Sequence, residues 1–299
     1  MKKLLTMFVA TLFLVACNTD KSAKCSASTK CDANTNVSIC TFNIMIQGQK
    51  PYIKKDGTDL SWNKRLPLIA SFVKTNDFDV IGCQEPIPAQ VEDVKKAIEK
   101  YDLYYKPVRT NMTPSPCNPI YFKKAKYELL DKGEFYYSRT PEVESNDWDS
   151  PRSRCCTWVK LREKKSGKEF YVFNTHFTHI GNVAKAESAK VLTAKIKEIA
   201  KGAPSFAMGD LNSYPTYPGI VHIVNSGVLK DSKVASMSEP VGNGPSFHGF
   251  RAKEDPKVDR IDFIFVSPQV EVKSYCLDKK KYGAIQMSDH YPVHIKATF

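Results

Sequence analysis

A series of short apolar runs constrains the fold of this chain more than any other feature. Residues 37–42, 79–83 and 205–208 are almost entirely apolar. Continuous runs of this kind are typical of strands that are covered on both faces. The same pattern predicts further strands at residues 120–122, 127–130, 135–137, 157–161, 169–174, 261–266 and 292–297.

Segments with helical periodicity lie between these runs. Residues 87–98 carry apolar side chains at the spacing of an amphipathic helix, and residues 184–200 form the clearest helix, which Gly202 would end. Residues 67–73 also have helical spacing, with Pro67 acceptable only in a first turn. Strands that alternate with helices favour a layered α/β architecture.

The first 16 residues predict a signal peptide. Lys2 and Lys3 precede an apolar run over residues 4–16, which is shorter than the roughly 20 residues that a spanning helix needs. The run ends in Leu14-Val15-Ala16 before Cys17, which is typical of a lipobox. We therefore expect lipidation at Cys17 and anchoring to a membrane of the bacterial cell envelope, on its periplasmic or surface side. The alternative is an ordinary signal peptide with Cys17 near the cleavage site by chance.

Residues 17–36 are polar and predict a flexible tether after the lipidated cysteine. Residues 37–299 contain no Gly/Ser-rich linker and no internal repeat, so a single domain is expected there. The formal net charge of +12 would attract polyanions, or it reflects only a lysine-rich, solvated surface. Cys40 and Cys83 lie in apolar runs and are expected to be buried thiols.

Six groups of polar residues stand at the ends of predicted strands. They are Asn43, Gln84-Glu85, Asn174-Thr175-His176, Gly209-Asp210-Leu211-Asn212, Asp259-Arg260-Ile261-Asp262 and Ser288-Asp289-His290. Each group alone could be a turn or a helix cap. Strand ends, however, are where loops present functional groups on a rigid frame. The six groups together therefore predict one site.

In this order the groups resemble the endonuclease/exonuclease/phosphatase (DNase I-like) superfamily over residues 37–299. The most specific elements are Gly-Asp-x-Asn and Ser-Asp-His-x-Pro-Val. The chain is similar to a bacterial secreted branch with distant likeness to deadenylase and nocturnin-type members. That likeness rests on Trp62-x-x-Arg65, Asn118-Pro119-Ile120-Tyr121, Trp148-Asp149, Arg154-Cys155-Cys156-Thr157-Trp158 and Phe247-His248-Gly249-Phe250.

The resemblance implies a four-layer α/β sandwich in which two central mixed β-sheets carry helices on their outer faces. It also implies a divalent metal, usually Mg²⁺, with Mn²⁺ and Ca²⁺ as alternatives. Glu85 would hold this metal, with Asn43 and Asp289 close by. Hard oxygen ligands of this kind suit Mg²⁺.

The resemblance further implies hydrolysis of phosphodiester or phosphomonoester bonds by in-line attack of water. Asp210 would accept the proton of the water or orient it, and Asn212 would donate a hydrogen bond to the nucleophile or to a phosphoryl oxygen. His176 and His290 would contact phosphoryl oxygens as cations. Asp262 would orient His290 and raise its pKa.

Four further residues are expected to contact the substrate: Arg154, His179, His248 and Asn118. Two departures from the bacterial pattern leave the identity of these substrate contacts undecided. Relatives often read Thr-His-x-Asp-His-x-Gly with an arginine soon after, whereas this chain has Thr178 in place of the acid and Lys185 in place of the arginine.

The substrate class stays open from the sequence. The positive charge and the deadenylase likeness favour a nuclease, whereas the predicted anchor favours a phospholipid or sugar-phosphate phosphoesterase. We expect a monomer that acts on a phosphorylated substrate. An alternative of another class is a surface lipoprotein that binds a ligand without catalysis. Against it, all six groups carry the polar residues that the resemblance leads us to expect.

Overall fold

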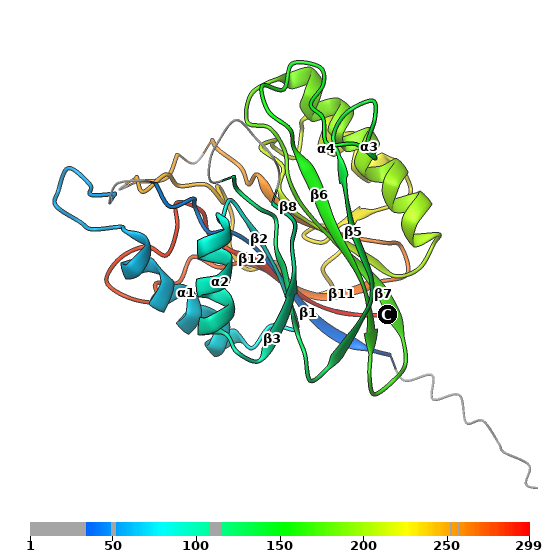
Figure 1. The fold of residues 1–299 in the computed structure, drawn as a ribbon, viewed down its shortest axis with the longest axis horizontal. Helices are drawn as coiled ribbons and strands as arrows, with labels where there is room; N and C mark the ends of the chain where they lie inside the picture. Colours follow the sequence, from blue (N-terminus) through cyan, green and yellow to red (C-terminus); the bar gives the residue numbers. More distant parts are fainter. Residues whose placement is uncertain (1–33, 49–51, 108–114, 252, 256) are drawn as a thin grey trace, which may run out of the picture. The chain divides into compact units, whose positions relative to one another are not determined.

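The computed structural model describes residues 34–48, 52–107, 115–251, 253–255 and 257–299, which form two six-stranded mixed sheets packed face to face (Figure 1). In order across the first sheet lie β11 (Glu271–Leu277), β12 (Val293–Thr298), β1 (Asn36–Asn43), β2 (Val80–Gln84), β4 (Ile120–Lys123) and β3 (Tyr101–Tyr104). Across the second sheet lie β5 (Tyr127–Tyr136), β6 (Cys155–Glu163), β7 (Glu169–His176), β8 (Ser205–Asp210), β10 (Asp262–Val266) and β9 (Lys230–Asp231).

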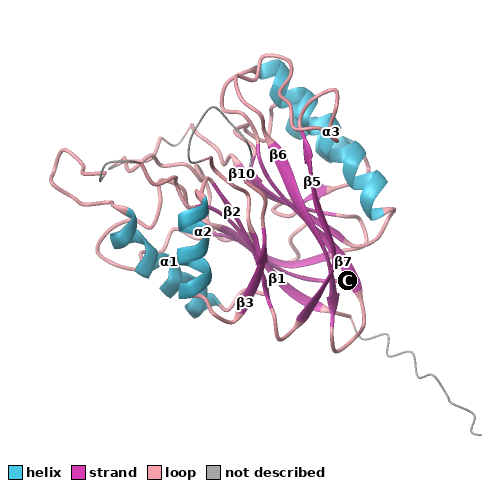
Figure 2. Ribbon diagram, viewed as in Figure 1, coloured by secondary structure: helices cyan, strands magenta, loops and turns pink. Residues whose placement is uncertain are grey.

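Helices cover the outer face of each sheet (Figure 2). On the first sheet lie α1 (Trp62–Asn76) and α2 (Pro88–Ala97), and on the second lie α3 (Asn182–Ala200) and α4 (Pro218–Asn225). The order of layers is therefore helices, sheet, sheet, helices. This arrangement confirms the four-layer α/β sandwich that the resemblance implied.

The apolar runs of the sequence are explained by burial on both faces of each strand. In β1, Val37 and Ile39 belong to the core between the sheets, whereas Cys40 and Phe42 belong to the core beneath α1 and α2. Successive side chains of a strand point to opposite faces, so a strand between two cores is apolar throughout. Cys40 and Cys83 are buried free thiols, as predicted.

Helix α1 is longer than the sequence indicated. It begins at Trp62, so Pro67 lies inside the helix and not in its first turn. Proline removes the hydrogen bond to the carbonyl four residues earlier, which here is that of Asn63. Because Asn63 is in the first turn, the loss falls close to the helix terminus and the helix continues.

Several other elements differ from the prediction. The runs at residues 127–130 and 135–137 belong to one strand, β5, whose register shifts between Leu129 and Asp131. Strands β3, β9 and β11 and helix α4 were not predicted. Strand β11 alternates buried and exposed residues at the edge of its sheet, and this pattern is weaker than a continuous apolar run.

Strand β1 begins one residue before the apolar run predicted at residues 37–42. Strand β1 starts at Asn36, and the amide of the buried Thr35 donates to the carbonyl of Phe299 at 2.9 Å. The predicted signal peptide, the lipidation site Cys17 and most of the predicted tether lie outside the described residues. Within the described part of the chain, none of the helices combines the length and the apolar character needed to cross a bilayer.

Candidate active site

The predicted polar groups meet at one edge of the sandwich. Asn43 ends β1 beside the end of the parallel strand β2, which Glu85 follows. His176 and Asp210 are register partners at the ends of the parallel strands β7 and β8, and Asp262 begins the antiparallel strand β10 directly opposite Asp210. The Nδ2 atom of Asn43 donates to Asp210 Oδ2 at 3.0 Å, so the two sheets contact each other at this point.

Unusual backbone conformations occur near the ends of these strands and in the loops that follow them. Gly209 has a φ of 150°, and a Cβ atom there would lie 1.9 Å from the carbonyl oxygen of Thr175. Glu85 and Asn212 have φ values of 73° and 48°. Asparagine tolerates the left-handed region, but for glutamate it is strained, and such strain persists where the surrounding structure fixes it.

Asn43 orients two carboxylates. Its Nδ2 donates to Glu85 Oε1 at 3.1 Å as well as to Asp210, and its Oδ1 accepts the amide proton of Met45 at 3.0 Å. A backbone N–H can only donate, so the orientation of the amide is determined by its partners. Asn43 thus lies beside Glu85, as expected; it presents its N–H groups to the acids, and its Oδ1, which accepts one hydrogen bond from Met45, keeps a second lone pair.

His290 and Asp262 form the predicted pair. The Nδ1 atom of His290 lies 2.8 Å from Asp262 Oδ2, and its Nε2 atom lies 3.7 Å from Asp210 Oδ2. Burial opposes the charged imidazole, but the carboxylates of Asp262, Asp210 and Asp289 outweigh it and raise the pKa of His290 to about 10. His290 is therefore a cation at neutral pH.

His176 has the opposite charge state. The Nδ2 atom of Asn212 lies 3.1 Å from His176 Nε2 and 3.0 Å from the carbonyl oxygen of Phe177. The carbonyl requires a donor, so the Asn212 atom beside the imidazole is the amide nitrogen. The same Nε2 atom of His176 lies 3.5 Å from Asp210 Oδ2. Burial, followed by the charges of Arg154 and His290, holds the pKa of His176 well below its usual range.

Two expectations therefore change. Burial holds the pKa of His176 well below its usual range, whereas the resemblance implied a cation. Asn212 was expected to donate to the nucleophile, but both of its N–H groups are used by His176 and Phe177. The oxygen of its side chain remains, and an oxygen can only accept a hydrogen bond from water.

Glu85 and Asp289 fit a divalent cation. Burial raises the pKa of Asp289, which the charge of His290 opposes and that of Glu85 reinforces. Across the described ranges, neither carboxylate forms an ion pair with a lysine, arginine or histidine. Two carboxylates that line one cavity and form no ion pair among the described residues are a donor set that Mg²⁺ would neutralise.

A second group of possible ligands lies deeper in the site. This group consists of one ligand atom from each of three residues, Asp210, Asp262 and His290, and these three atoms lie within 4.8 Å of one another. In that group the imidazolium of His290 already neutralises negative charge and uses its Nδ1 for Asp262. We therefore favour the position at Glu85 and Asp289 for a cation.

These side chains open into a cavity of about 450 Å³. Arg154 lines it, half-buried, and the part of the chain that the structure describes offers its guanidinium no hydrogen-bond acceptor. Burial lowers the pKa of Arg154, which the charges of Glu85 and Asp210 partly oppose. The lining residues are Ile46, Glu85, Pro116, Arg152, Arg154, His176, His179, Asp210, Asn212, Phe247, Ile261, Asp289 and His290.

Two predicted substrate contacts do not line this cavity. The Nδ2 atom of Asn118 donates to the carbonyl of Cys155 at 3.0 Å, so Asn118 holds the start of β6. His248 is buried, and its Nδ1 accepts the amide proton of Phe250 at 3.1 Å while its own amide donates to the carbonyl of Asp289 at 2.9 Å. Both residues support the site from behind, whereas Arg154 and His179 line the cavity, and their contact with a substrate stays a prediction.

The two departures from the family pattern also have local roles. The hydroxyl of Thr178 donates to the carbonyl of Ile180 at 2.6 Å, within the loop that carries His179. The ammonium of Lys185 donates to the carbonyl of Asn212 at 3.4 Å. Lys185 therefore supports the loop after β8 from outside the cavity.

Sequence reasoning missed several lining residues, namely Arg152, Pro116, Phe247, Ile46 and Ile261. Arg152 had a usable signal, because it stands two residues before Arg154 and side chains two apart in extended backbone point the same way. Phe247 belongs to the Phe247-His248-Gly249-Phe250 element, but its place at the cavity depends on a bridge to His290 from a distant part of the chain.

Comparisons with known proteins agree with this geometry. Residues 40–290 match the model of the endonuclease/exonuclease/phosphatase family. A mannosyl-6-phosphatase of Bacteroides thetaiotaomicron VPI-5482 is 31% identical in sequence, with a TM-score of 0.78 over 88% of this chain and 100% of that one. An endonuclease/exonuclease/phosphatase family protein from Bacteroides thetaiotaomicron is also 31% identical, with a TM-score of 0.79 over 89% of this chain and 99% of that one.

More distant relatives include Nocturnin. The Drosophila melanogaster protein is 25% identical over 294 residues, which cover 86% of this chain and 44% of the fly protein. The chain thus spans about half the length of the curated relatives it matches. The human Nocturnin catalytic domain shares the fold. It is 18% identical in sequence, with a TM-score of 0.68 over 88% of this chain and 94% of that one.

Proposed function

The chain belongs to the endonuclease/exonuclease/phosphatase family, and on this premise we propose that it is a divalent-metal-dependent phosphatase that hydrolyses phosphomonoesters of small polar molecules. Relatives in this family are hydrolytic phosphoesterases. The observation that carries the monoester proposal is the guanidinium of Arg154, which lines the cavity, half-buried, without a hydrogen-bond acceptor among the described residues. The charges of Glu85 and Asp210 only partly offset the desolvation of this cation, and the oxygens of a phosphate would accept its hydrogen bonds.

The charges of the cavity suit a terminal phosphate. A phosphomonoester carries one more anionic oxygen than a diester, and Arg154, Arg152 and His290 place cationic groups around one cavity. The metal, held by Glu85 and Asp289, would neutralise charge on the phosphoryl group and stabilise the leaving oxygen. The likeness to a mannosyl-6-phosphatase, whose whole length this chain covers, supports a sugar phosphate as the substrate.

The remaining residues account for the attack by water. Asp210 would take the proton of the water, because burial and the nearby Asp262 raise its pKa and make it a better base. The side-chain oxygen of Asn212 would accept a hydrogen bond from the same water and orient it. The protonated His290 would donate to the phosphoryl oxygens as negative charge builds up.

A nuclease is the second candidate, and the net charge of +12 favours it. The two functions differ in what Arg154 does. If the substrate is a monoester, Arg154 binds the additional oxygen, and its loss affects monoesters more than diesters. In a nuclease the same loss would affect both classes of substrate equally.

The test is a substrate panel with and without Mg²⁺. Sugar phosphates, nucleotides, oligonucleotides and phospholipids would be compared with wild-type protein, Arg154→Met and the control Arg139→Met, whose side chain is exposed. We expect kcat/KM for a hexose phosphate to fall at least about 100-fold in Arg154→Met, because charged hydrogen bonds to a buried phosphate are strong. Equal losses on monoesters and oligonucleotides would refute the monoester proposal.

The metal is tested at Glu85. Glu85→Gln keeps the shape of the side chain and removes its charge, so Mg²⁺ binding and activity should fall together while the fold is retained. Mg²⁺ titration followed by activity and by calorimetry measures both. Unchanged activity with unchanged metal dependence would show that Glu85 is not the main ligand.

A further inference from the structure

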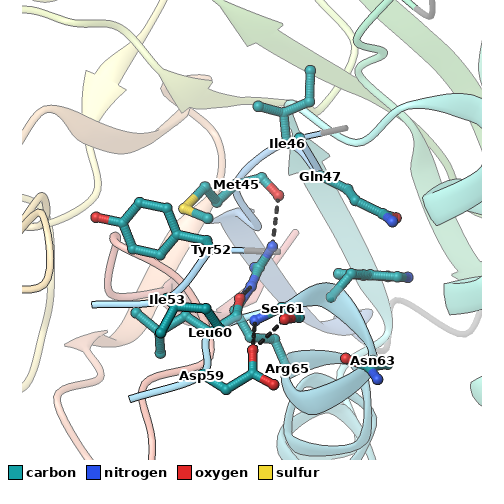
Figure 3. A pocket seen from close by; sticks show the side chains of 12 residues that line it. Met45, Ile46, Gln47, Tyr52, Ile53, Asp59, Leu60, Ser61, Asn63 and Arg65 are labelled. Atoms are coloured by element: carbon teal, nitrogen blue, oxygen red, sulfur yellow. Dashed lines mark hydrogen bonds between the residues drawn. The ribbon is translucent and has the colours of Figure 1, made fainter. Parts of the chain in front are cut away.

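A buried arginine lies directly behind the proposed metal site. Arg65, in the first half of α1, is 1% exposed and forms no ion pair with any described carboxylate. Its guanidinium instead donates to four main-chain carbonyls. The Nε atom donates to the carbonyl of Leu60 at 2.9 Å, and Nη2 donates to that of Met45 at 3.1 Å. The Nη1 atom donates to the carbonyls of Ile44 at 2.5 Å and Met287 at 3.0 Å. Figure 3 shows this side chain between Leu60 and Met45.

These carbonyls belong to the segments that hold the acids. Ile44 and Met45 follow β1 directly after Asn43, and Met287 stands two residues before Asp289. In the same segment, the amide of Ile46 donates to Glu85 Oε2 at 3.0 Å. One guanidinium therefore ties the loop that fixes the carboxylate of Glu85 to the loop that carries Asp289.

The loop after β1 needs such a restraint. Met45 has a φ of 57°, in the left-handed region that residues other than Gly, Asn and Asp rarely adopt. Such strain persists only when surrounding contacts over-determine it. Gln90 adds to the restraint, since its Nε2 donates to the carbonyl of Met45 at 3.2 Å and its Oε1 accepts the amide proton of Gln47 at 2.8 Å.

We propose that Arg65 is a positioning residue for the metal site, acting on Glu85 and Asp289 through the carbonyls of Ile44, Met45 and Met287. The geometry of the guanidinium matters here more than its charge. Its five donors lie in a rigid planar fork and reach several segments at once, whereas a lysine ammonium is a compact point charge. This inference rests on the proposed function, because it assumes that these two acids hold a divalent cation.

The decisive comparison is Arg65→Lys against Arg65→Met in the full chain, with Lys64→Gln as control. Lys64 is the exposed neighbour in the same helix, so its loss removes one positive charge and leaves the hydrogen bonds of Arg65 to the main-chain carbonyls in place. Mn²⁺ affinity would be measured by calorimetry. We expect both Arg65 variants to lose at least about tenfold in affinity, as is typical when a residue that orients metal ligands is removed, and Lys64→Gln to bind as wild type does.

Kinetics and a second variant separate positioning from general destabilisation. At saturating metal, kcat should fall in Arg65→Lys while KM for the phosphate ester stays the same. If Arg65→Lys does not fold, Ser288→Ala decides, because the Ser288 hydroxyl donates to the carbonyl of Asn43 at 2.6 Å and joins the same two loops. We expect Ser288→Ala to weaken Mn²⁺ binding in the same direction with a smaller factor.

Each result has a defined meaning. Wild-type Mn²⁺ affinity in a folded Arg65→Lys overturns the proposal, and so does wild-type affinity in Ser288→Ala when Arg65→Lys is unfolded. A wild-type protein that binds Mn²⁺ but hydrolyses no phosphomonoester refutes the proposed function alone, since the titrations still test Arg65. A wild-type protein that binds no Mn²⁺ refutes both.

Discussion

At the scale of single residues, the two histidines of the site show how local contacts set charge. His290 lies among three carboxylates and is a cation, whereas burial holds the pKa of His176 well below its usual range. One imidazole can therefore stabilise negative charge on a phosphate, and the other can position its neighbours.

The role of Asp262 is tested by the pH dependence of the rate. Activity that needs the protonated His290 is lost as the pH rises through its raised pKa of about 10. In Asp262→Asn the carboxylate that favours the charged imidazole is gone, so the basic limb of the profile should move to lower pH. The acidic limb should move the same way, because the pKa of Asp210 falls when the nearby negative charge is removed.

The measurement is kcat/KM against pH for wild type, Asp262→Asn and His290→Ala. We expect His290→Ala to lose a factor on the order of 10² to 10⁴, and Asp262→Asn to lose less. A profile of Asp262→Asn that coincides with wild type, beside an inactive His290→Ala, would separate the two residues functionally.

At the scale of elements, the site depends on how closely β7 and β8 approach each other. Gly209 pairs with Thr175, and the approach leaves no room for a side chain. Asp210 follows immediately, so the glycine determines where the proposed base stands. The sequence Gly-Asp-x-Asn thus combines a packing requirement with a functional one.

Gly209→Ala tests this requirement. The added Cβ would lie 1.9 Å from the carbonyl oxygen of Thr175, so one of the strands must move. We expect the free energy of unfolding to fall by more than about 2 kcal/mol, measured by urea denaturation. The control is Gly167→Ala, where φ is also positive but no atom lies within 4 Å; strain alone should cost about 1 kcal/mol there. Equal costs for the two variants would contradict the argument from close approach.

At the scale of the whole molecule, a buried polar link joins the two sheets behind the site. Gln84 Nε2 donates to Asn174 Oδ1 at 2.6 Å, and Asn174 Nδ2 donates to the carbonyl of Cys83 at 2.8 Å. Gln84 ends β2 and Asn174 lies in β7, so the link spans both sheets. Asn174 was grouped with the polar residues of the site, but its hydrogen bonds join the two sheets.

Anchoring of the whole chain stays a prediction from residues outside the described part. We propose that Cys17 carries a lipid that holds the protein on the bacterial cell envelope. Cys17→Ser should then move the protein from the membrane fraction to the soluble fraction when cells are lysed and fractionated. Retention of the variant in the membrane with an unchanged apparent mass would contradict lipidation.

The elements and the family could be predicted from the sequence because their signals are local. A strand covered on both faces is largely apolar along its length, and such apolar runs can be recognised in the sequence at residues 37–42 and 205–208. Polar residues at the ends of such runs then predicted that Glu85, Asp210 and His290 belong to one site. Edge strands such as β11 gave only a weak alternation and were missed.

Charge states and hydrogen-bond directions were decided only by tertiary structure, because they depend on partners far away in the chain. His290 gains its charge from Asp262 and Asp210, and the amide of Asn43 donates to Asp210 in the other sheet. Burial of His248 depends likewise on packing against Tyr291. The sequence determined which residues reach the site, and the packing of the two sheets decided which atoms of those residues face the substrate, since only packing fixes burial and neighbours.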